Sequence, residues 1–140
     1  MRPPSIIWFE RLFLGAVAVG LVNSAMVFDQ LREIPGAQPL GPGFLIGSIA
    51  IGVVINLALW FFIARRASNG ARWVLVVLFL FGAVSLIFSV SMGSYPSGTA
   101  GLLGAFGWLL QAAAVTMLFR RDAAAWFRGT RDDDLGETFE

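Results

Sequence analysis

Residues 73–92 read WVLVVLFLFGAVSLIFSVSM, a run of 20 residues that contains no charged side chain. A helix rises about 1.5 Å per residue, so a helix of this length crosses the roughly 30 Å hydrocarbon core of a bilayer. Because lipid offers the backbone no hydrogen-bond partners, a membrane segment must satisfy its own, and helix is the expected conformation. The run therefore predicts a transmembrane helix.

Three similar runs lie on either side of it, at about 6–28, 44–64 and 100–119. Turn-forming residues separate the runs, and such short connections make successive helices neighbours that run in opposite directions. Hydrophobic residues make up 57% of the 140-residue chain, above the about 45–50% of a soluble domain. The sequence predicts an all-α integral membrane protein with four antiparallel transmembrane helices in residues 1–120.

Residues 121–140 follow the last run and differ from it in character. Arg121 to Arg128 predict a short helix at the membrane interface, with Trp126 at the headgroup level. The acidic stretch from Asp132 to Glu137 predicts a disordered tail, either solvated or docked on a partner. We therefore expect an interfacial segment and an acidic disordered tail after the four-helix domain.

The arginines predict the orientation. All ten basic residues are Arg, and nine of them flank the same ends of the predicted helices. By the positive-inside rule that side faces the cytoplasm, which predicts a multi-pass protein of the bacterial inner (cytoplasmic) membrane with both termini cytoplasmic. The side chains expected to meet lipid headgroups are Arg65, Arg66, Arg72, Arg120, Arg121 and Trp126.

The chain contains no Cys and no His. Their absence excludes disulfides, thiolate metal sites, Cys nucleophiles and bis-His haem. The net charge of +1 argues against a nucleic-acid partner. We expect no cofactor and no metal, and no nucleophile–base pair is visible. An enzyme that acts on lipids through Glu10 and the arginines is therefore the least favoured class.

Glu10 and Arg11 are adjacent opposite charges near the start of the first run. Ionisable groups in a membrane are costly and often functional, but long side chains near a helix end can reach the aqueous interface. An interfacial anchor or an ion pair to another helix is the favoured interpretation. A proton-coupled carboxylate of a small exporter is the alternative.

Three amides lie inside the apolar runs: Asn23, Asn56 and Gln111. A buried amide in lipid seeks a hydrogen-bond partner, so structural interhelical bonds are the favoured interpretation. Lining a polar cavity or binding a lipid headgroup is the alternative. Because Asn23 and Asn56 are expected at different depths, a direct pair between them is not expected.

Small residues recur at spacings of three and four, which allows helix backbones to approach closely. The pattern cannot say whether the neighbouring helix belongs to the same chain. The residues are Ala16, Gly20 and Ser24, then Gly43, Gly47, Ser48 and Gly52, then Gly101, Gly104 and Gly107.

Two short stretches carry a family resemblance. The opening Arg2-Pro3-Pro4-Ser5-Ile6 with Phe9-Glu10, and the later Ala71-Arg72-Trp73-Val74, resemble parts of small, uncharacterised four-helix inner-membrane proteins of bacteria. The resemblance implies a fold and a location and does not imply an activity.

The favoured function is that of a non-catalytic integral membrane protein, either an accessory or structural subunit of a larger membrane complex or a homo-oligomer. Its expected partners are membrane lipids and other membrane subunits or further copies of the chain. A small oligomeric transporter or channel is the alternative, with a polar path lined by the three amides and the serines of residues 85–91.

Overall fold

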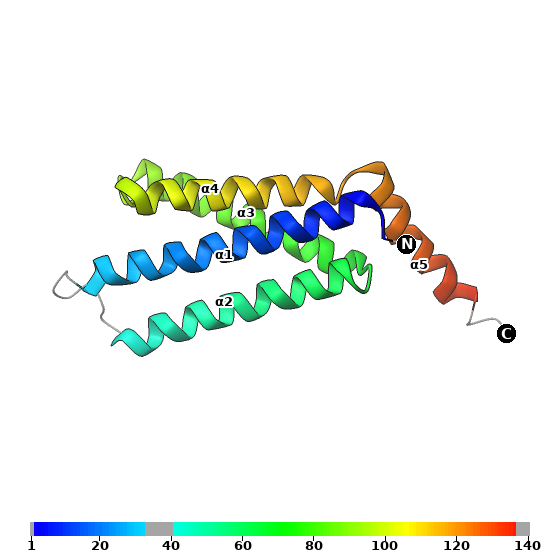
Figure 1. Cartoon of the computed structure of the whole chain (residues 1–140), viewed down its shortest axis with the longest axis horizontal. Coiled ribbons are helices and arrows are strands. Elements are labelled where there is room, and N and C mark those ends of the chain that lie inside the picture. The colour runs from blue at the N-terminus through cyan, green and yellow to red at the C-terminus, as the bar shows by residue number, and fades with distance from the viewer. Residues whose placement is uncertain (1, 33–40, 137–140) are drawn as a thin grey trace.

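The computed structural model describes residues 2–32 and 41–136, and within them it contains five helices. The helices are α1 (Pro4–Arg32), α2 (Gly41–Ala64), α3 (Asn69–Ser91), α4 (Gly98–Met117) and α5 (Arg121–Gly136). The first four are long and apolar enough to cross a membrane, as the four apolar runs predict. Figure 1 shows these four side by side along the long axis, with α5 extending beyond them.

Helices α1 and α4 form the tightest pair. A Cβ atom added to Gly107 would lie 3.2 Å from Val19 Cγ1, and one added to Gly104 would lie 3.3 Å from Asn23 Nδ2. Later residues of α1 therefore meet earlier residues of α4. Glycine at these positions allows the close approach of the two helices.

Helices α2 and α3 bury much less of their surface. Only 6% of the apolar window of α3 and 11% of that of α2 is buried within the chain, against 28% for α1 and for α4. Phe81 and Ile87 are 72% and 68% exposed. Large apolar side chains are left uncovered on a soluble surface only as scattered residues, so this extent of exposure fits a hydrocarbon environment.

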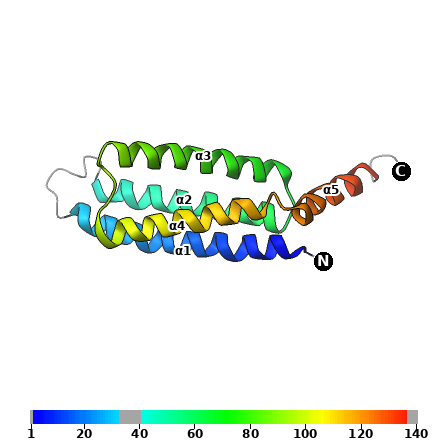
Figure 2. The same cartoon turned by 90° about the horizontal axis from the view of Figure 1, so that it is seen from above.

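The buried core lies toward one end of the bundle, where α1 begins. Phe9 and Phe13 of α1 are fully buried with ring centroids 5.3 Å apart. Buried beside them are Ile63 of α2, Leu75 of α3 and Leu118, which directly follows α4. The start of α1, the turn after α2 and the end of α4 meet at this end, and each of them carries arginines. We therefore call it the arginine-rich end. In Figure 2 the N-terminus and α5 lie at this end.

The ends of the helices differ by a few residues from the apolar runs, because hydrogen bonds rather than hydropathy determine them. The Ser68 hydroxyl accepts a bond from the Ala71 N–H at 3.3 Å, so α3 begins at Asn69 and not at 73. Helix α4 ends at Met117, before the expected 119. There the Leu118 N–H donates to the Val115 carbonyl at 3.1 Å, a bond to the third preceding residue that tightens the turn.

Helix α5 is longer than the interfacial helix expected over 121–128. Its backbone is helical to Gly136, so the acidic residues at 132–134 belong to a helix and not to the disordered tail expected there. Arg128 and Asp132 are four residues apart, a spacing at which opposite charges favour helix. Residues 137–140, the rest of the predicted tail, and most of the first predicted loop at 33–40 lie outside the described residues.

Candidate functional site

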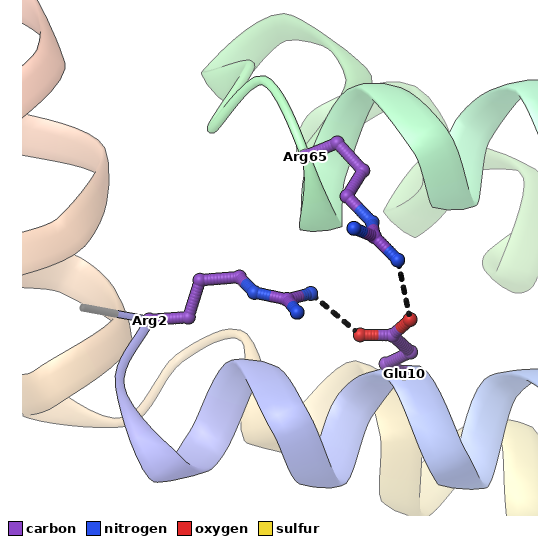
Figure 3. A network of polar contacts seen from close by, with 3 residues as sticks. All are labelled: Arg2, Glu10 and Arg65. Carbon is purple, nitrogen blue, oxygen red and sulfur yellow. Dashed lines mark hydrogen bonds and ion pairs between the residues drawn. The ribbon is translucent and has the colours of Figure 1, made fainter.

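Glu10 joins two helices at the arginine-rich end. Its carboxylate accepts a hydrogen bond from Arg2 Nη1 at 2.8 Å and lies 3.5 Å from Arg65 Nη2, just after α2 (Figure 3). The Glu10 side chain is 19% exposed, while Arg2 and Arg65 are 36% and 48% exposed. Solvated ion pairs of this kind contribute about 0–1 kcal/mol each. The arrangement therefore ties the start of α1 to the end of α2 modestly.

The neighbouring Arg11 has a different partner. Its guanidinium carbon lies 5.9 Å from the centre of the Trp8 ring, within the range of a cation–π contact. The two adjacent charges thus point to separate neighbours, one ionic and one aromatic. Arg65 repeats the aromatic contact, with its guanidinium carbon 5.7 Å from the Trp60 ring.

A cavity of about 250 Å³ lies between α1 and α2 and is partly open. Its wall includes Gly20 and Gly52, and its polar lining comes from Ser24, Asn56 and, across from α4, Gln111. Asn56 Nδ2 donates to the Gly52 carbonyl at 2.8 Å, so part of this amide is satisfied by its own helix. We call this space the α1–α2 cavity. It brings two of the three predicted amides together.

Asn23 lines a different cavity, of about 350 Å³, between α1, α3 and α4. Ser85, Ser89 and Tyr95 share its lining, and Tyr95 donates its hydroxyl proton to the Gly101 carbonyl at 2.7 Å. Among the described residues, the buried Asn23 Oδ1 has no hydrogen-bond partner. The residues of the predicted polar path are therefore divided between two cavities.

The glycines of the small-residue pattern fall into two groups. A Cβ atom at Gly20, Gly43, Gly47 or Gly52 would meet no atom of the described residues within 4 Å. On α4 the opposite holds, because a Cβ atom at Gly101 would collide with the Pro96 carbonyl. Contacts within the chain thus explain the glycines of α4 and leave those of the α1 and α2 faces without a neighbour.

The residues expected at lipid headgroups gather at the arginine-rich end. The Arg72 guanidinium carbon lies only 4.1 Å from the Phe119 ring centre, so the start of α3 contacts the residues after α4. Arg120 Nη1 lies 3.9 Å from the sulfur of Met117. Arg66 and Arg121 are exposed, and Trp126 is partly buried beside the core.

Asp122 makes a contact that the sequence analysis missed. The Ser5 backbone N–H, one of the free donors at the start of α1, donates to Asp122 Oδ2 at 3.2 Å. Hydrogen bonding from Ser5 holds the pKa of Asp122 below its usual range. The buried Ser5 hydroxyl has no hydrogen-bond partner among the described residues, so the backbone N–H makes the contact with Asp122. A single acidic residue among the arginines of 120–128 was the available signal.

Within the part of the chain that the structure describes, no group of three His, Cys, Asp or Glu side chains could hold a metal ion. Comparison with protein-family models, with curated proteins and with solved structures gives no match.

Proposed function

We propose that the chain is a non-catalytic protein of the bacterial inner (cytoplasmic) membrane that acts by associating with other transmembrane helices. It would serve as an accessory or structural subunit of a larger membrane complex, or as a homo-oligomer. The observation that carries this proposal is the pair of small-residue faces beside the α1–α2 cavity. Gly20, Gly47 and Gly52 have open space where a Cβ atom would lie, although such spacing is typical of helix contacts.

The proposed topology has four antiparallel transmembrane helices with both termini in the cytoplasm. Two features support it. Nine of the ten arginines lie at one set of predicted helix ends, and three of these, Arg11, Arg65 and Arg72, lie within 6 Å of a tryptophan ring. Arginine and tryptophan side chains together are typical of the cytoplasmic membrane interface.

Reporter fusions test this topology. A fusion after Arg66 and one at the C-terminus should both report the cytoplasm, and one after Pro39 should report the outside. A cytoplasmic signal after Pro39 would contradict the proposed orientation.

The association is tested by purifying the full chain in nanodiscs and measuring the mass of what accompanies it. We expect a fixed stoichiometry with a partner or with further copies. Gly20→Leu should abolish that association, because the new side chain would enter the α1–α2 cavity. Ala18→Leu is the matched control, since Ala18 is exposed on the same helix and does not line the cavity. A monomeric wild-type chain without partners would refute the proposal.

A small transporter or channel is the second candidate, and the α1–α2 cavity is the observation that favours it. Asn56 of α2 and Gln111 of α4 line one space, as a polar path would require. Glu10 does not line that space. Flux that is lost in Gln111→Leu, with the chain still inserted, would favour this candidate. Loss in Glu10→Gln with pH-dependent transport would indicate proton coupling.

A further inference from the structure

A second kind of site lies at the junction of α3 and α5. A cavity of about 210 Å³ is lined by Asn69 and Arg72 from the first turn of α3, and by Ala124, Phe127 and Arg128 from α5. Phe127 and Arg128 follow Ala124 by three and four residues, so both lie on the same side of α5 as Ala124. The cavity is smaller than the roughly 300–1,000 Å³ typical of drug-sized ligands, which suits a compact group.

Arg72 is held in this cavity by aromatic rings. Its guanidinium carbon lies 4.1 Å from the Phe119 ring centre, 5.4 Å from that of Phe127 and 5.9 Å from that of Trp73. Such contacts act on the faces of the planar guanidinium and leave its N–H groups, which lie in the plane, free for another acceptor. The Arg72 Nε is buried and has no hydrogen-bond partner among the described residues.

Among the side chains that the structure describes, no carboxylate pairs with Arg72 or Arg128. The ion pairs in the described part of the chain join Arg2 and Arg65 to Glu10, and neither Arg72 nor Arg128 takes part in one. Two positive charges therefore line a small cavity, and its described lining contains no carboxylate. The N-terminal end of α3 adds partial positive charge at the same place.

The position of the cavity indicates what the negative partner is. Arg72 directly precedes the apolar run that begins at Trp73, so the cavity lies at the level where a bilayer has its headgroups. We propose that Arg72 and Arg128 bind the phosphate of one anionic phospholipid. The arginine forks match a phosphate through paired charge-assisted hydrogen bonds. This inference rests on the membrane location in the proposed function and is independent of what the chain associates with.

Native mass spectrometry of the full chain, titrated with phosphatidylglycerol and separately with phosphatidylcholine of the same acyl chains, tests the site. We expect one phosphatidylglycerol to bind saturably and about 10-fold or more tightly than phosphatidylcholine. Arg128→Gln should weaken that binding about 10- to 100-fold, the loss typical of one charged hydrogen-bond partner. Arg72→Gln should do the same, and circular dichroism reports whether it still folds.

Arg66→Gln is the matched control, because Arg66 is exposed at the same end and does not line the cavity. It removes the same charge and should change the affinity less than about twofold. Equal weakening in Arg66→Gln and Arg128→Gln would overturn the site in favour of diffuse attraction. Inorganic phosphate should not displace the lipid at equal concentration, and displacement would overturn the lipid assignment in favour of a free phosphate. Unchanged association with partners would show that only the lipid site had failed.

Discussion

Alanine in place of Gly101 tests the turn between α3 and α4. The added Cβ atom would collide with the carbonyl of Pro96 and would lie 3.3 Å from Tyr95 Cε1. The carbonyl belongs to the backbone of the α3–α4 turn, so it cannot move without moving the turn. The same turn is held by the hydrogen bond from the Tyr95 hydroxyl to the Gly101 carbonyl, at 2.7 Å. Steric strain and the loss of this bond should therefore occur together.

The free energy of unfolding should fall by about 2–3 kcal/mol in Gly101→Ala. Overpacking costs about 1–3 kcal/mol, and a collision with backbone belongs at the upper end of that range. The lost hydrogen bond adds about 0.5–1.5 kcal/mol, and the better helix propensity of alanine returns up to about 1 kcal/mol. In Gly20→Ala only the gain remains, because nothing lies within 4 Å of the new atom.

The two variants should consequently differ by about 3 kcal/mol in the free energy of unfolding. The assay is titration of the purified protein from mild detergent into sodium dodecyl sulfate, followed by helical circular dichroism and tryptophan fluorescence. Equal stability of Gly101→Ala and Gly20→Ala would refute the proposed packing of the turn against α4. A loss in Gly20→Ala that depends on protein concentration would instead point to association through the α1–α2 cavity.

Three further substitutions have defined outcomes. Glu10→Gln should lower the unfolding free energy by no more than about 1–2 kcal/mol, and added salt should erase the difference, because the contact to Arg65 is solvated. The pKa of Asp122 is depressed in the folded chain, so its contact with Ser5 stabilises the fold fully above about pH 3.9 and is lost as the pH falls through the folded pKa. The melting temperature of the wild-type chain should therefore fall over this acidic range, and Asp122→Asn should abolish that dependence. Trp108→Leu should lower the unfolding free energy by about 0.5–1.5 kcal/mol more than the loss of buried apolar area alone, because the Trp108 and Phe79 rings are stacked with centroids 4.7 Å apart. Thermal unfolding of the two proteins measures this difference.

The four apolar helices could be predicted because hydropathy over about 20 residues is a strong and local signal. Their ends could be predicted only approximately, since single hydrogen bonds determine them. The Ser68 cap starts α3 four residues before the apolar run at Trp73, and the cap depends on a side-chain conformation. The length of α5 was underestimated for a different reason. The acidic composition of residues 132–134 predicts disorder, whereas the backbone there is helical.

The choice of helix neighbours could not be predicted, because α1, α2 and α4 all carry small residues at packing spacing. Only the geometry shows that Gly104 and Gly107 face α1, while Gly47 and Gly52 face open space. The candidate site could likewise be predicted only in part. The expected depths in the membrane predicted that Asn23 and Asn56 do not pair, and the two line different cavities, but no pattern in the sequence predicted that Gln111 shares a cavity with Asn56.

The uneven packing of the bundle connects these observations. Helices α1 and α4 bury their glycines against each other, so this pair has its contacts within the chain. Helices α2 and α3 bury little, although α2 carries glycines that are typical of close helix contacts. Lipid could cover any apolar face, but it gains nothing from glycine, whereas another helix gains close backbone contact. Glycines on an uncovered face are therefore better explained by association with a further helix than by exposure to lipid.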